Sequence, residues 1–294
     1  MTQRIADFGS RVVDRWPALA ARLRLDRLPI GWVALAYLAA LTLGEALVTF
    51  SFPQAGMYVH SAMLLALMLH ASLLARGPQR QFLLTLTLAP LIRLMSLSMP
   101  LPRFPFVYWY GIVGAPLIAA AYMAAWAAGL GQKDMGLPAF RLRGELSLST
   151  LFGLSGRMLV QLIVGLYGLG LGYVEYLILR PAPLVESLRW EQLWMPVLIL
   201  LVFTGYLEEI IFRGLMQHTS IRSLGRWWGM LYVALVFAVL HMGYRSALDM
   251  LFVFGVALFF GEVVARTGSI LGVTLSHGLT NITLFLVYPF FLAG

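Results

Sequence analysis

Apolar stretches follow one another along almost the whole chain, separated by short polar or proline-rich links. A helix needs about 20 apolar residues to cross the hydrocarbon core of a bilayer. The third stretch is short, broken near Pro90 and interrupted by Arg93, so eight spans with one re-entrant segment stay open beside nine. The predicted spans are residues 29–50, 57–75, 81–98, 106–130, 149–179, 193–220, 226–243, 247–265 and 269–290.

The composition supports this pattern, since 60% of the residues are hydrophobic and only 12% are charged. Such values are not those of a soluble globular domain. We therefore predict an all-α fold, a polytopic transmembrane helix bundle of eight or nine spans. The absence of cysteine excludes a disulfide, a thiol nucleophile and a thiolate metal site.

The net charge of +8 comes almost entirely from arginine, because Lys133 is the only lysine. In a membrane protein an excess of basic residues sets the orientation of the spans and binds anionic lipid. We therefore expect the bilayer as a partner and no nucleic acid. With the N-terminus in the cytoplasm, fourteen basic residues lie on that side and four outside, as the positive-inside rule requires. We expect a multi-pass protein of the plasma (inner) membrane of a prokaryote.

The chain divides into three parts on this interpretation. Residues 1–28 alternate apolar and basic residues at helical spacing, which predicts a basic amphipathic segment on the cytoplasmic leaflet, with a partly ordered basic tail as the alternative. Residues 29–144 hold the first four spans, whose role the sequence does not assign. Residues 145–294 hold the remaining spans and the polar residues that carry chemistry.

Polar side chains recur four residues apart in three of these C-terminal stretches. Charged and imidazole groups are costly inside a membrane and mark functional sites by default. Residues at i and i+4 share one helix face, so the three pairs predict one site inside the bundle. If the hairpin of the sixth and seventh spans protrudes into the cytoplasm, the depth of the motifs along these spans predicts that the site opens toward the cytoplasmic side. The motifs are Glu208-Glu209-x-x-x-Arg213, Phe237-x-x-x-His241 and His277-x-x-x-Asn281.

The residue types suggest how such a site works. Glu208 and His241 together can polarise a water molecule for attack on a carbonyl carbon. His277 and Asn281 present N–H donors, which suit the oxyanion that then develops. Glu209 and Arg213 stand in the favourable order for a salt bridge along one helix.

Charged residues outside these motifs have structural interpretations. Glu45 and His60 flank a turn at matching depth, and Arg93 can join them in a polar clamp between spans. Ser246 and Asp249 have the spacing of a helix capping box, and Glu262 and Arg266 that of a helix salt bridge.

The three motifs resemble those of the CPBP (ABI) family, which includes the type II CAAX prenyl endopeptidases. The sequences Phe212-Arg213-Gly214 and Ser276-His277-Gly278 also look like those of the family, and the resemblance covers roughly residues 145–290. It implies a glutamic-type intramembrane endopeptidase without a cofactor. In that mechanism Glu208 and His241 activate water, His277 and Asn281 stabilise the oxyanion, and Glu209, Arg213 and Phe237 support the site.

Several alternatives stay open at this stage. Two histidines and a carboxylate also match catalytic zinc sites, with Glu208, His241 and His277 as ligands, although there is no His-Glu-x-x-His helix. A non-catalytic scaffold or maturation factor of the same family and a proton-coupled transporter are the other functions considered. The substrate is a membrane-embedded or lipidated peptide in the protease interpretation, and CAAX cleavage, sorting-tail removal and bacteriocin processing are equally open.

Overall fold

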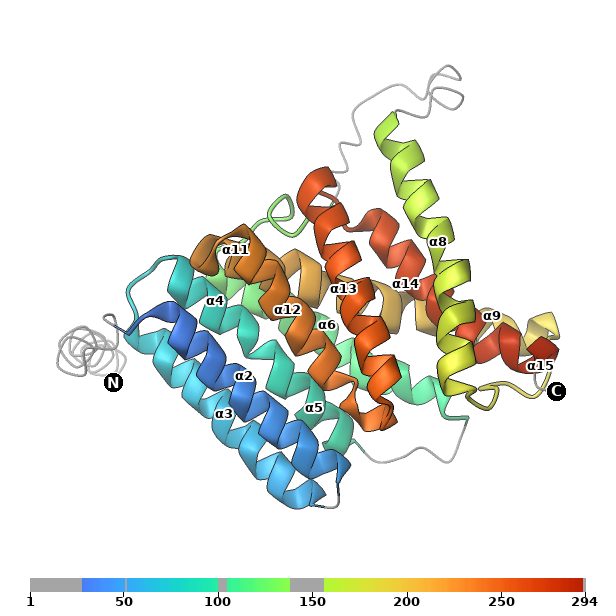
Figure 1. The fold of residues 1–294 in the computed structure, drawn as a ribbon, viewed down its shortest axis with the longest axis horizontal. Helices are drawn as coiled ribbons and strands as arrows, with labels where there is room; N and C mark the ends of the chain where they lie inside the picture. Colours follow the sequence, from blue (N-terminus) through green and yellow to red (C-terminus); the bar gives the residue numbers. More distant parts are fainter. Residues whose placement is uncertain (1–27, 51, 100–104, 138–155, 293–294) are drawn as a thin grey trace, which may run out of the picture.

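The structure is a computed structural model, and it describes residues 28–50, 52–99, 105–137 and 156–292. Within these ranges the chain is helical and contains no strand, as predicted (Figure 1). Nine of the described helical segments are long and apolar enough to cross a membrane. The protein is therefore an all-α, multi-pass integral membrane protein. The predicted segment 1–28 falls on residues outside the description, except for Leu28, and so does the predicted boundary between residues 144 and 145.

The nine candidate spans lie where the hydropathy pattern predicts them. The N-terminal half contains α2 (Ile30–Thr49), α3 (Pro53–Leu73), α4 (Pro78–Leu86), α5 (Leu88–Ser98) and α6 (Val107–Ala128). The following spans are α8 (Gly156–Leu179), the long helix Trp190–Leu224, α12 (Arg226–Leu240), α13 (Ala247–Thr267) and the helix Leu271–Leu292. This last helix consists of α14 (Leu271–Ile282), the π-helical η5 (Thr283–Val287) and α15 (Tyr288–Leu292).

The third span is interrupted near Pro90, as predicted. The break between α4 and α5 falls at Thr87, which keeps a right-handed helical backbone. Pro90 has no N–H, so it cannot bond the carbonyl oxygen one turn before it, at Leu86. The missing bond weakens the ladder upstream of the proline, which explains why α4 ends at Leu86.

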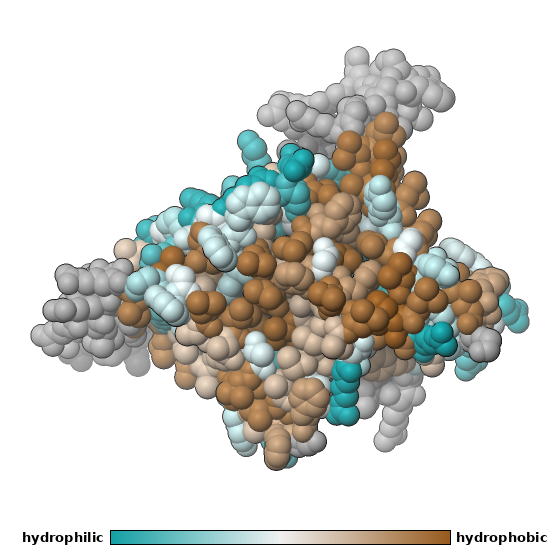
Figure 2. Space-filling model, viewed as in Figure 1, coloured by the Kyte–Doolittle hydropathy of each residue, from teal (hydrophilic) through white to brown (hydrophobic). Residues whose placement is uncertain are grey.

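The outer surface is apolar across the bundle. Figure 2 shows hydrophobic side chains over most of the visible face of the helices, with hydrophilic residues gathered toward the ends, for example around α11 (His218–Leu224). Many of the large exposed side chains are Leu, Met, Phe and Trp. An exposed apolar belt of this kind fits the hydrocarbon core of a bilayer.

Small residues bring the helices of the C-terminal half close together. A Cβ atom at Gly168 or Gly172 of α8 would overlap the backbone of α14, and one at Gly205 would lie 2.9 Å from the Gly278 nitrogen. Close backbone contact through small residues is the usual way in which membrane helices associate. These contacts hold α14 between α8 and the helix that carries the two glutamates, and so determine where His277 lies.

Candidate active site

The helix that carries Glu208 and Glu209 departs from α-helical geometry on both sides of them. It consists of α9 (Trp190–Ile199), η2 (Leu200–Tyr206), α10 (Leu207–Glu209), η3 (Ile210–Gln217) and α11, and η2 and η3 are π-helical. π-Helical turns are rare and occur frequently at functional sites. The sequence pattern did not predict them.

Glu209 and Arg213 form the predicted salt bridge, and both are buried. Arg213 Nη1 donates to Glu209 Oε1 over 2.9 Å, and the side chains are 1% and 0% exposed. The guanidinium also lies 4.7 Å from the ring centroid of Phe237 and 5.5 Å from that of Phe260. The aromatic faces stabilise the cation, so Phe237 supports Arg213 directly.

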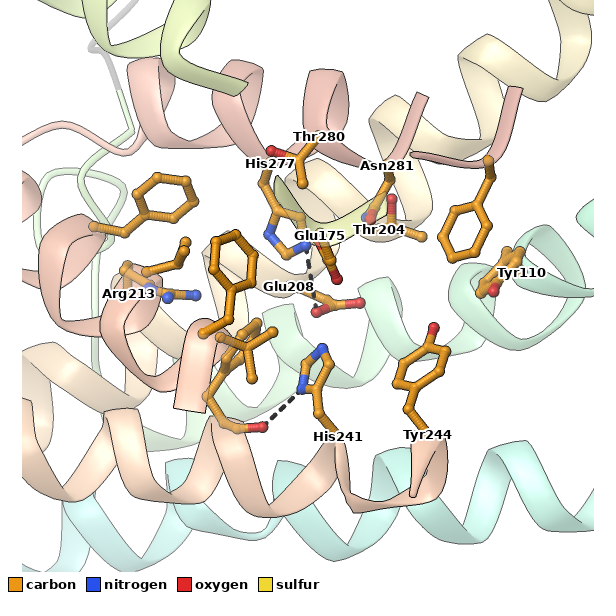
Figure 3. A pocket seen from close by; sticks show the side chains of 16 residues that line it. Tyr110, Glu175, Thr204, Glu208, Arg213, His241, Tyr244, His277, Thr280 and Asn281 are labelled. Atoms are coloured by element: carbon orange, nitrogen blue, oxygen red, sulfur yellow. Dashed lines mark hydrogen bonds and ion pairs between the residues drawn. The ribbon is translucent and has the colours of Figure 1, made fainter. Parts of the chain in front are cut away.

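Glu209 has a second partner that the sequence did not indicate. His277 Nδ1 lies 2.7 Å from Glu209 Oε1, the same oxygen that accepts from Arg213. A carboxylate acceptor places the ring proton on Nδ1 and fixes the orientation of the imidazole. Nε2 of His277 consequently faces Glu208, with 3.7 Å between Nε2 and Glu208 Oε2 (Figure 3).

His241 approaches Glu208 from the other side. It is the residue that follows α12, and its Nδ1 lies 2.8 Å from the carbonyl oxygen of Phe237, one turn earlier. The carbonyl can only accept, so Nδ1 carries the proton and Nε2 is left for the pocket. Figure 3 shows this second nitrogen directed toward Glu208, whose carboxylate lies between the two imidazoles.

The four predicted catalytic residues line one pocket. It has a volume of about 70 Å³, and its walls include Glu208, His241, His277 and Asn281 together with Thr204 and Thr280. A cavity needs roughly 10–15 Å³ of accessible volume to hold a water molecule, so this pocket accommodates a few. Its polar walls fit water and a peptide carbonyl group.

A larger apolar cavity adjoins the polar pocket. It has a volume of about 320 Å³ and is lined mainly by apolar side chains of α5, α6, η2 and α12, such as Val113, Leu117 and Phe203. The two cavities share four lining residues, which are Tyr110, Glu208, His241 and Tyr244. Glu208 therefore stands where a polar reaction space meets an apolar channel.

The predicted polar clamp of the N-terminal half is present, and it reaches the active site. Arg93 donates to both carboxylate oxygens of buried Glu45, at 2.8 and 2.5 Å, and His60 Nε2 lies 3.4 Å from Glu45 Oε1. Arg93 also donates to the carbonyl oxygen of Leu240 over 2.9 Å. The last carbonyl groups of a helix have no partner within the helix, so the cation satisfies this one directly beside His241.

We expect Arg93→Ala to reduce the turnover number by misplacing His241. A shift of about 1 Å in a catalytic group can cost on the order of 10² in rate. Measurement of kcat, KM and the melting temperature on this variant checks the expectation. Arg189→Ala is the control, because Arg189 is exposed and its salt-bridge partner among the described residues is exposed Glu191. A destabilised Arg93→Ala protein with unchanged kcat would limit the clamp to a role in folding.

Ten of the residues that line the pocket were not predicted, and three of these have titratable side chains. The three are Tyr110 of α6, Glu175 of α8 and Tyr244 of the 3₁₀ turn η4 (Met242–Tyr244). Glu175 lies alone in an apolar stretch, and that isolation was the one signal the sequence offered. The two tyrosines resemble the many other aromatic residues of the bundle, and nothing in their spacing distinguishes them.

The capping box predicted at the start of α13 is only half formed. Ser246 Oγ accepts from the Asp249 backbone nitrogen over 3.1 Å. A full capping box would also have the Asp249 carboxylate accept from the Ser246 backbone N–H. This second bond is missing, since the carboxylate is buried and neither of its oxygens has a hydrogen-bond partner.

The predicted Glu262–Arg266 salt bridge is formed, with 2.5 Å between Arg266 Nε and Glu262 Oε1, and Arg226 also pairs with Glu262.

The described residues do not suit a metal ion. Within the described part of the chain no three His, Asp or Glu side chains converge on a common point in the way that an ion requires. The two nitrogens of His277 face the two glutamates, and Nδ1 of His241 is bonded to the Phe237 carbonyl. We therefore derive no step through zinc.

Fold and site together define a class of protein. It is a multi-pass helical membrane protein in which two histidines and Glu208 line one pocket and Glu209 bonds one of the histidines. Residues 190–283 match the sequence model of a family described as type II CAAX prenyl endopeptidase Rce1-like. The match begins with α9, ends just after α14 and includes all three motifs. This third of the chain is thus similar to CAAX-type proteases, in agreement with the resemblance seen in the sequence. No curated protein and no solved structure matches the chain at a significant level.

Proposed function

We propose that the protein is an intramembrane endopeptidase that hydrolyses a peptide bond of a membrane-associated substrate without a metal ion. The observation that carries this proposal is the position of Glu208. Its carboxylate lies between two imidazoles, at the junction of a polar pocket and an apolar cavity. Such a site can hold a water molecule and a carbonyl group next to each other while the rest of the substrate occupies apolar surroundings.

In the proposed reaction Glu208 and His241 activate the water. The carboxylate accepts a proton from the water as the oxygen attacks the carbonyl carbon. His241 Nε2, left free by the bond from Nδ1 to Phe237, orients the same water. The proton then passes to the leaving amine when the peptide bond breaks, so the products are a carboxylic acid and an amine.

His277 and Asn281 stabilise the negative charge on the carbonyl oxygen in this proposal. Both line the pocket, one helical turn apart on α14. Glu209 fixes the His277 ring so that Nε2 faces the reaction space, and a proton on Nε2 makes it a donor. Preorganised donors are usually the largest contribution to catalysis of acyl transfer. Glu209 and Arg213 act by holding His277 in place.

The apolar cavity suggests the kind of substrate. About 320 Å³ lies within the usual range of ligand pockets, roughly 300–1,000 Å³. We propose that it takes an apolar or lipidated part of a membrane-embedded peptide, with the bilayer as the second partner and no nucleic acid. The cytoplasmic N-terminus and the plasma (inner) membrane of a prokaryote stay predictions.

A direct cleavage assay tests the proposed function. The purified protein in lipid nanodiscs is incubated with membrane-anchored peptides that include prenylated, sorting-tail and unmodified sequences, and products are identified by mass spectrometry. We expect one internal bond to be cleaved in at least one class. Peptides that bind but stay intact in every class would favour a scaffold or maturation factor.

We also expect chelators to leave the rate unchanged. Glu208 and His241 suffice to activate water in this proposal, so removal of divalent ions takes nothing from the site. Cleavage rates with and without 1,10-phenanthroline, and zinc content by mass spectrometry, check this. A zinc peptidase treated in parallel is the control. Loss of activity that added zinc restores would replace this mechanism by the metal-dependent one with Glu208, His241 and His277 as ligands.

A further inference from the structure

Glu175 is an acidic residue of the pocket for which the proposed mechanism has no use. It lies on α8, outside the residues that match the family, and it is only 7% exposed. Its side chain lines the polar pocket, and Figure 3 shows its carboxylate beside that of Glu208. Among the described residues none forms a hydrogen bond or a salt bridge with it.

Asp249 provides a second buried carboxylate near the first. It is fully buried, and neither of its oxygens has a hydrogen-bond partner. It lies in the first turn of α13, and α13 packs against α8, the helix that carries Glu175. Glu175 thus lines the pocket without a partner among the described residues, and Asp249 is a second unpaired carboxylate that lies outside the pocket wall.

The charges around the pocket do not balance. Arg213 is matched by Glu209, and His277 lies between Glu209 and Glu208. No described arginine or lysine forms a salt bridge with Glu175 or Asp249. An ionised carboxylate buried without a partner is strongly unfavourable, so such a group holds a proton until a cation beside it stabilises the negative charge. The imbalance therefore favours a ligand that brings a positive charge.

We propose that Glu175, with Asp249 nearby, forms a subsite of the pocket that binds a cationic group of the substrate, an ammonium or a guanidinium. This inference rests on the proposed function and adds to it a preference for a basic group next to the scissile bond. The pocket of about 70 Å³ has room for such a head group beside a water molecule. An organic cation suits the site better than a metal ion, because the described side chains do not converge on one point.

Binding of a small amphiphilic cation tests the subsite independently of proteolysis. The probes are octylammonium and its neutral acetamide, and affinity is measured from the rise in melting temperature of the protein in nanodiscs. We expect the wild-type protein to favour the cation by about ten- to hundredfold, the effect of one charge-assisted hydrogen bond. Glu175→Gln should lose this preference, while Glu191→Gln, which removes an exposed acid of α9, should keep it.

If the wild-type protein and Glu175→Gln show the same ratio of affinities for the cationic and the neutral probe, the proposal is overturned. Should Glu175→Gln fail to fold, Asp249→Asn is the second variant, because it removes the other buried carboxylate that has no hydrogen-bond partner. A several-fold weaker preference for the cation is then expected, and an unchanged preference would overturn the proposal equally.

Cleavage kinetics supply the second test where a cleaved peptide is known. A basic residue is placed at each position within two residues of the scissile bond and compared with norleucine. At one position we expect Glu175→Gln to lower kcat/KM for the basic peptide by about ten- to hundredfold and to spare the neutral one. An equal loss of kcat/KM for the basic and the neutral peptide would mean that Glu175 acts in the hydrolysis of every substrate, and this would contradict the proposed subsite. If wild type cleaves no peptide, the proposed function fails, whereas the binding test still decides on the cation site.

Discussion

Glu208→Gln is expected to abolish measurable peptide cleavage and to leave the bundle folded. The amide keeps the shape of the side chain but cannot accept a proton from water. Loss of a positioned general base costs typically about 10²–10⁴ in rate. The structure adds a reason for retained folding, because the residue that holds buried Arg213 and His277 is Glu209 and not Glu208. Cleavage rate and melting temperature, measured on one preparation, check both parts.

Glu191→Gln is the control for this experiment, since it makes the same chemical change on an exposed side chain. Its rate should equal that of the wild-type protein. Retained cleavage by Glu208→Gln would remove Glu208 from the role of base. The next candidate would then be Glu175, the other carboxylate that lines the pocket.

Arg213→Ala and Asn281→Ala are expected to fail in different ways. Removal of Arg213 leaves Glu209 buried without its cation, and the loss of one partner of a buried pair costs about 3–5 kcal/mol. The vacated space between Phe237 and Phe260 adds to this loss. Arg213→Ala should therefore show a lower melting temperature and lower expression, and any activity lost should follow the loss of folded protein.

Asn281→Ala should instead keep the melting temperature and lose rate. The side chain is assigned one hydrogen bond to a transient oxyanion, and removal of one such donor costs roughly 10²–10³ in kcat. Measurement of melting and turnover on both variants separates the two roles. A stable but inactive Arg213→Ala protein would place Arg213 among the groups that act on the substrate, which its position in the pocket wall allows.

The features that the sequence predicted correctly are those with a local periodicity. The nine spans follow from continuous apolar stretches, and the Glu209–Arg213 salt bridge follows from the i, i+4 spacing on one helix. The link between Glu45, His60 and Arg93 was also predictable, because a short turn joins the first two helices and places their polar residues at equal depth.

What the sequence did not predict depends on how distant helices approach one another. The bond from His277 to Glu209 joins residues 68 positions apart, and the glycine contacts between α8 and α14 bring Glu175 into the same wall. Neither has a signature within one helix. The capping box formed only in part for a related reason. The Ser246 hydroxyl accepts from the Asp249 backbone N–H, as the spacing predicted, whereas the Asp249 carboxylate is buried without a hydrogen-bond partner.

The most direct test of the central claim is a single-turnover cleavage in H₂¹⁸O, carried out with hydroxylamine present. Attack by a water molecule that Glu208 activates predicts one ¹⁸O atom in the new carboxylate of the product, no hydroxamate, and no product at all from Glu208→Gln. A hydroxamate would reveal an acyl-enzyme and a protein nucleophile. That result, or equal product from Glu208→Gln and the wild-type protein, would contradict the account.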